Sequence, residues 1–116
     1  MIKLRRGGKV SKLLYLRECE HPDGFVFRFV NMPGGLEVAA YDIFSVFFPQ
    51  YKNFREFSDC IAYGEYQERD VYVNGKSTKI TTLPATTIHQ LLKSSSVQIA
   101  RGFMAWVRKS VIKSKF

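Results

Sequence analysis

The chain has 116 residues, of which 46% are hydrophobic and 15% aromatic, a composition that favours a folded domain and excludes a mostly disordered chain. Its formal net charge of +8 makes a polyanion the expected partner. No apolar run approaches the roughly 20 residues that span a bilayer, and residues 1–10 lack the apolar core of a signal peptide. We therefore expect no membrane span and no secretion, with Cys19 and Cys60 reduced.

The positive charge is concentrated in the C-terminal part of the chain. Residues 71–116 contain eight Lys or Arg and no Asp or Glu, whereas residues 1–70 contain ten basic and ten acidic residues. The net charge therefore comes entirely from residues 71–116. A solvated surface normally carries both signs close together, so this imbalance favours an anion-binding function.

The first third of the sequence predicts a small antiparallel sheet. Residues 1–12 are basic and contain two glycines, which suits either a flexible arm along a phosphate backbone or a first edge strand. Residues 12–17 and 24–30 are expected to be strands joined by a turn at 21–24. A second turn at 31–35 then leads into a strand at 36–40.

Two helices are expected next, each marked by a capping residue. Asp42 is expected to cap a helix over 43–48, which ends before Pro49. Asn53 and Glu56 form a capping box for a second helix to about residue 63, with Gly64 after its end.

The C-terminal half predicts a hairpin followed by two helices. The pair Asn74-Gly75, between strands at 70–73 and 76–82, is the signature of a type I′ turn. Pro84 begins a helix to about residue 93, and Ser95 with Gln98 forms a capping box for a last helix over 95–113. The apolar face of that last helix consists of Ile99, Ala100, Phe103, Trp106, Val107 and Val111. Together the elements predict an α+β fold, with a small antiparallel sheet and about four helices in a single domain over 1–116.

The order and spacing of these elements carry a family resemblance. The run Ala100-Arg101-Gly102-Phe103-Met104-Ala105-Trp106-Val107, followed by Val111-Ile112, fits the pattern Ala-Lys-x-Phe-x-x-Trp-Val and a Val-Leu pair. Residues 88–93, 36–47 and 51–63 fit the preceding segments. The chain thus resembles, over residues 25–113, the Bro-N domain of the baculovirus repeated-open-reading-frame proteins. It departs from that pattern at Phe54, Thr87 and Lys113, where the family has Pro, Gly and often Pro. The resemblance implies a viral DNA-binding domain in the nucleus or cytoplasm of an infected host cell.

Charge and resemblance both favour non-catalytic DNA binding through phosphate contacts, with weak or no sequence specificity. The sequence does not distinguish double-stranded from single-stranded DNA as the ligand. The residues expected to contact phosphates are Lys93, Arg101, Arg108, Lys109, Lys113 and Lys115 around the last helix, Lys76 and Lys79 on the hairpin, and Lys52 and Arg55 at the start of the middle helix.

The aromatic-rich stretch 44–57 supports an alternative function. If its side chains are exposed, they form a patch for a protein-interaction or assembly module, either a homo-oligomer or a complex with a viral or host protein. Exposed aromatics also stack on unpaired bases. If the side chains are buried, they fill the core between sheet and helices. The stretch contains Phe44, Phe47, Phe48, Tyr51, Phe54 and Phe57.

No residue pattern indicates an enzyme, a metal site or a cofactor. Cys19, His21, Cys60 and His89 lack the spacing of a structural zinc site. Gly8-Lys9 lacks the other residues of a phosphate-binding P-loop. We therefore expect no catalysis, no cofactor and no small-molecule substrate.

Overall fold

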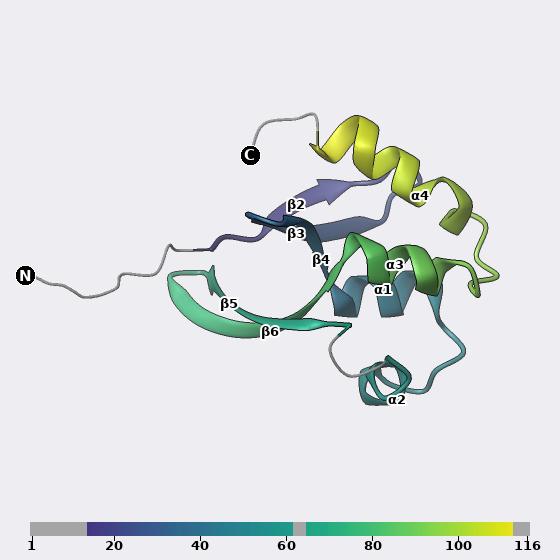
Figure 1. Cartoon of the computed structure of the whole chain (residues 1–116), viewed down its shortest axis with the longest axis horizontal. Coiled ribbons are helices and arrows are strands. Elements are labelled where there is room, and N and C mark those ends of the chain that lie inside the picture. The colour runs from purple at the N-terminus through teal and green to yellow at the C-terminus, as the bar shows by residue number, and fades with distance from the viewer. Residues whose placement is uncertain (1–13, 62–64, 113–116) are drawn as a thin grey trace, which may run out of the picture.

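A computed structural model describes residues 14–61 and 65–112 of the chain, and within them it contains one five-stranded antiparallel sheet and four α-helices (Figure 1). The strand order is β2-β3-β4-β6-β5. The strands are β2 (Arg17–Glu20), β3 (Val26–Met32), β4 (Gly35–Ala39), β5 (Gln67–Val73) and β6 (Lys76–Pro84). The helices are α1 (Ala40–Phe47), α2 (Phe54–Ser58), α3 (Ala85–Leu92) and α4 (Ala100–Trp106), which continues as the π-helix η2 (Val107–Ile112). The predicted α+β class is confirmed. No helix in the described part of the chain is long and apolar enough to cross a membrane.

The core lies between the sheet and helices α1, α3 and α4. Because side chains alternate along a strand, Phe27 and Phe29 of β3 both enter this core, and both are fully buried. The ring centroid of Phe27 lies 5.8 Å from that of Phe47 in α1 and 4.7 Å from that of Phe103 in α4. These rings therefore fix the positions of both helices relative to the sheet.

The predicted Asn74-Gly75 hairpin is confirmed. Both residues have positive φ, 52° for Asn74 and 79° for Gly75, as a type I′ turn requires. The hairpin strands are longer than expected, because β5 pairs with β6 from Gln67 opposite Thr82 to Val73 opposite Lys76.

The predicted position of the first strand is wrong. Residues 14–16 precede the strand, which begins at Arg17, while residues 12 and 13 lie outside the described part. The backbone N–H of Tyr72 in β5 instead donates to the carbonyl oxygen of Leu14 at 2.8 Å, and Tyr15 bridges Tyr72. Since β2 and β5 are the two edges of the sheet, this bridge shows that the sheet is curled.

The prediction that Asp42 caps a helix is wrong. Strand β4 leads into α1 without a loop, so the helix begins at Ala40 and Asp42 falls in its first turn. The Asp42 carboxylate accepts hydrogen bonds from the backbone N–H of Arg28 at 2.8 Å and from its guanidinium group at 2.8 and 3.1 Å. A long-range ion pair therefore takes the place of the expected local cap.

The Asn53 cap of α2 is confirmed, but the predicted length of the helix is wrong. The Asn53 side-chain oxygen accepts from the Glu56 N–H at 2.9 Å. The helix ends at Ser58, after which the N–H groups of Cys60 and Ile61 bond three residues back, as in a tight turn. The expected C-terminal cap, Gly64, lies outside the described residues.

The predicted capping box at Ser95 is also wrong. The Ser95 hydroxyl donates to the carbonyl oxygen of Phe47 at 2.8 Å and accepts from the Val97 N–H at 3.2 Å. Ser95 therefore ties the loop between α3 and α4 to the end of α1, and α4 begins five residues later, at Ala100. The expected apolar face is confirmed, with Ala100, Phe103, Val107 and Val111 buried and Ile99 and Trp106 partly buried.

Candidate nucleic-acid interface

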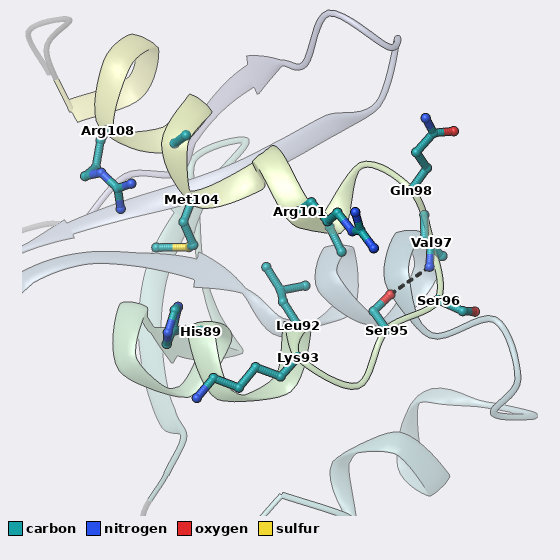
Figure 2. Close-up of a pocket in the computed structure, with 12 residues that line it drawn as sticks. His89, Leu92, Lys93, Ser95, Ser96, Val97, Gln98, Arg101, Met104 and Arg108 are labelled. Carbon is teal, nitrogen blue, oxygen red and sulfur yellow. Dashed lines mark hydrogen bonds between the residues drawn. The ribbon is translucent and has the colours of Figure 1, made fainter.

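An open groove of about 940 Å³ lies between α3 and α4 (Figure 2). One wall is the end of α3, the other is the outer side of α4 with the first turn of η2, and the loop 94–98 closes one end. The groove is lined by His89, Leu92, Lys93, Ser95, Ser96, Val97, Gln98, Ala100, Arg101, Met104, Ala105 and Arg108.

Three of the predicted phosphate-contacting residues converge on this groove. Lys93 stands at the end of α3, while Arg101 and Arg108 lie on the facing side of α4 and η2, where residues three and four apart share one face. All three side chains are exposed, and none of them forms an ion pair with any residue that the structure describes. Among the residues described, no Asp or Glu lines the groove. Its positive charge is therefore uncompensated locally.

The floor of the groove is apolar and anchored in the core. Leu92 and Ala100 are 9% and 7% exposed, and Met104 projects from α4 into the groove (Figure 2). On the opposite side of α4, Phe103 packs 5.1 Å from Phe47 between ring centroids, and Trp106 packs 5.9 Å from Phe27. The helix that carries the two arginines is therefore held on the sheet by aromatic contacts.

The other predicted residues that the structure describes do not join the groove. Lys109 is exposed on η2 but does not line it, and Lys113 and Lys115 lie outside the described residues. Lys76 and Lys79 stand on β6, and the Lys79 ammonium lies 3.3 Å from an Asp70 carboxylate oxygen. Lys52 and Arg55 belong to the α2 region, which lies on the side of the molecule away from α4 in Figure 1. A single surface for all ten expected contacts is therefore not found among the described residues.

Arg28 and Arg69 are engaged in structural ion pairs with Asp42 and Glu37. Arg69 donates two hydrogen bonds, of 2.9 and 2.8 Å, to the carboxylate of Glu37, which also accepts one of 2.7 Å from the Thr82 hydroxyl. Burial raises the pKa of Glu37, but the hydrogen bonds from Arg69 and Thr82 outweigh it and leave the pKa below its ordinary value. The hydrogen bonds to Asp42 favour the charged form of Arg28 and raise its pKa. These carboxylates neutralise the arginines beside them rather than the groove.

The aromatic-rich stretch 44–57 belongs to the core. Phe47, Phe48 and Phe57 are at most 2% exposed, while Phe44, Tyr51 and Phe54 are half-buried and pack against the core. The burial alternative of the sequence analysis therefore holds for this stretch. The adjacent Tyr41 is 54% exposed.

The candidate metal ligands of the sequence do not come together. Among the described residues no three His, Cys, Asp or Glu side chains cluster in a way that would hold a metal ion. Cys19 and Cys60 are free thiols, and the His21 ring packs on Trp106 with 4.8 Å between ring centroids. His89 lines the groove instead, a role that was missed although its spacing of four residues from Lys93 places both on one face of α3.

The geometry of the groove suits an extended anion more than a small substrate. Three cations stand around an open, partly apolar surface, and phosphate oxygens would meet lysine and arginine donors from two helices at once.

Neither the protein-family models, nor the curated proteins, nor the solved structures include a match to this chain.

Proposed function

We propose that the protein binds DNA through phosphate contacts in the groove between α3 and α4. The observation that carries this proposal is the convergence of Lys93, Arg101 and Arg108 on one open surface, which no acidic residue lines in the described part of the chain. A protein that neutralises phosphates releases condensed counterions, and this release drives binding of any sequence. The resemblance to the Bro-N domain supports the same function and suggests the nucleus or cytoplasm of an infected cell.

The proposed binding has weak sequence specificity. Phosphate contacts position a protein on DNA but carry no sequence information. The groove is an open depression with arginines on its outer wall, rather than a helix presented for insertion into the major groove. We therefore expect similar affinity for duplexes of different sequence.

Two neighbouring charge reversals test the proposal. Arg108→Glu removes a groove cation, whereas Lys109→Glu makes the same charge change one residue further along η2, outside the groove. Arg108→Glu is expected to weaken binding of a labelled duplex about tenfold or more, because a hydrogen bond to a charged group contributes roughly 1.5–3 kcal/mol. Lys109→Glu is expected to weaken it much less. Fluorescence anisotropy measures both, and equal losses for the two variants would contradict the proposed site.

The alternative function, a protein-interaction or assembly module, has less support. The aromatic stretch that suggested it packs into the core. Exposed large apolar side chains remain at Tyr15, Phe25, Val26, Tyr41, Tyr72 and Ile112. Sizing of the protein over a range of concentrations tests self-association, which would appear as a concentration-dependent increase in mass.

A further inference from the structure

A second, smaller hollow lies where β4 leaves the sheet and the chain turns into α1. Its volume is about 250 Å³, just below the roughly 300 Å³ at which pockets for whole small ligands begin. It shares no residue with the groove between α3 and α4. The hollow is lined by Arg28, Ala39, Tyr41, Phe54, Lys79, Ile80 and Thr81.

One wall of the hollow is an exposed aromatic ring in a fixed position. Tyr41 is 54% exposed, yet its ring centroid lies 5.6 Å from that of Phe44 and 5.7 Å from that of Phe54. The two phenylalanine rings are themselves packed against the core. Tyr41 therefore offers an ordered apolar surface to solvent, which is the arrangement on which nucleobases stack.

A second wall of the hollow is an unpaired strand edge. Strand β6 pairs with β4 only through Thr82, Leu83 and Pro84, while residues 76–81 pair with β5 alone. The backbone groups of 76–81 that face away from β5 therefore lack a strand partner in the part of the chain that the structure describes. Those of residues 79–81, which line the hollow, place hydrogen-bond donors and acceptors beside Tyr41.

The side chains of Arg28 and Lys79 complete the hollow. The Arg28 guanidinium is held by two hydrogen bonds to Asp42, of 3.1 and 2.8 Å, so it presents a fixed planar group. The ammonium of Lys79 lies 3.3 Å from Asp70, but both side chains are more than 60% exposed. A solvent-exposed pair of this kind is weak, so the Lys79 ammonium is available to an incoming phosphate.

We propose that this hollow takes one unpaired nucleobase of single-stranded DNA, with Tyr41 stacking on the base, the free edge of β6 bonding to its polar rim and Lys79 meeting a neighbouring phosphate. The inference rests on the proposed DNA binding and adds that the DNA bound at the hollow is single-stranded. A base offers a flat face together with a hydrogen-bonding edge, and the hollow offers a partner for each. A peptide strand fits the same edge less well, because lysines such as Lys76 and Lys79 on an edge discourage strand addition.

The test compares three ligands of equal length on the full chain: a single strand, a single strand lacking all bases, and a duplex. The wild-type protein is expected to bind the natural single strand more tightly than the abasic one. Tyr41→Ala should weaken binding of the natural strand about fivefold or more, since about fivefold is the lower end of the loss for one stacked base. The affinities for the abasic strand and for the duplex should not change. Tyr41→Phe keeps the stacking ring and should bind as the wild type does.

Tyr72→Ala is the matched control, because Tyr72 is a partly exposed tyrosine outside the hollow, and it is expected to leave binding unchanged. A Tyr41→Ala protein that binds the natural strand as tightly as the wild type overturns this inference and leaves the groove proposal standing. A wild-type protein that binds none of the three ligands overturns both proposals. If an extended neutral peptide shifts the backbone NMR signals of residues 79–81 and the oligonucleotide does not, the hollow is a peptide site and the inference is wrong.

Discussion

The salt dependence of DNA affinity reports directly on the groove. The triple variant Lys93→Gln, Arg101→Gln and Arg108→Gln removes its three uncompensated positive charges and introduces no negative charge. If each side chain neutralises one duplex phosphate, the three together contribute about 2.7 to the slope of log affinity against log salt. A slope of about 2.7 corresponds to a roughly 40-fold loss of affinity between about 50 and 200 mM salt. The variant is expected to lack this part of the wild-type salt dependence.

A second triple variant separates the groove from the net charge. Arg55→Gln, Lys76→Gln and Lys109→Gln also remove three positive charges, from exposed side chains that do not line the groove. Anisotropy titrations of a labelled duplex over a series of salt concentrations give the slope for each protein. We expect the control triple to lower the slope by less than about one, the contribution of a single phosphate. Equal slopes for the two triples would show that affinity follows total charge and would refute the groove.

The remaining predictions concern stability. Glu37→Gln leaves Arg69 and Thr82 without their carboxylate partner and is expected to lower the free energy of unfolding by about 3 kcal/mol, measured by urea denaturation. The pKa of Glu37 is lowered in the folded chain from the ordinary 4.5, so its ionisation stabilises the fold above that pH, and this contribution is lost as the pH falls through the folded-state pKa. The stability of Glu37→Gln should therefore depend less on pH in this acidic range, and an unchanged acid profile would contradict the assignment. Gly102→Ala places a methyl group in open space on α4 and is expected to stabilise the protein by roughly 0.5–1 kcal/mol, seen as a higher melting temperature with unchanged DNA affinity.

The parts of the fold that local chemistry determines could be predicted from the sequence. The Asn74-Gly75 turn was predictable because positive φ at both positions restricts the residues that a type I′ turn accepts. The apolar face of the last helix followed from its periodicity, and α3 begins directly after Pro84, as expected. In each case the structure depends on neighbours within a few residues.

The parts that tertiary contacts determine could not be predicted. Asp42 and Ser95 both have the side chains of helix caps, but each bonds to a segment far away in sequence, Asp42 to Arg28 and Ser95 to Phe47. The charge imbalance of residues 71–116 identified Lys93, Arg101 and Arg108 as candidates, yet gave no reason to separate them from Lys76 or Lys109. That separation depends on how α3 and α4 pack on the sheet.

Helix α4 joins the aromatic interior to the charged surface over a very short length of chain. Phe103 is two residues from Arg101, and Trp106 is two residues from Arg108, in a helix of only seven residues that passes into η2. A substitution that tilts this helix about its aromatic contacts therefore moves both guanidinium groups at once. The core residues of α4 and the residues that face the groove are therefore expected to evolve together, because a large change in one set requires a compensating change in the other.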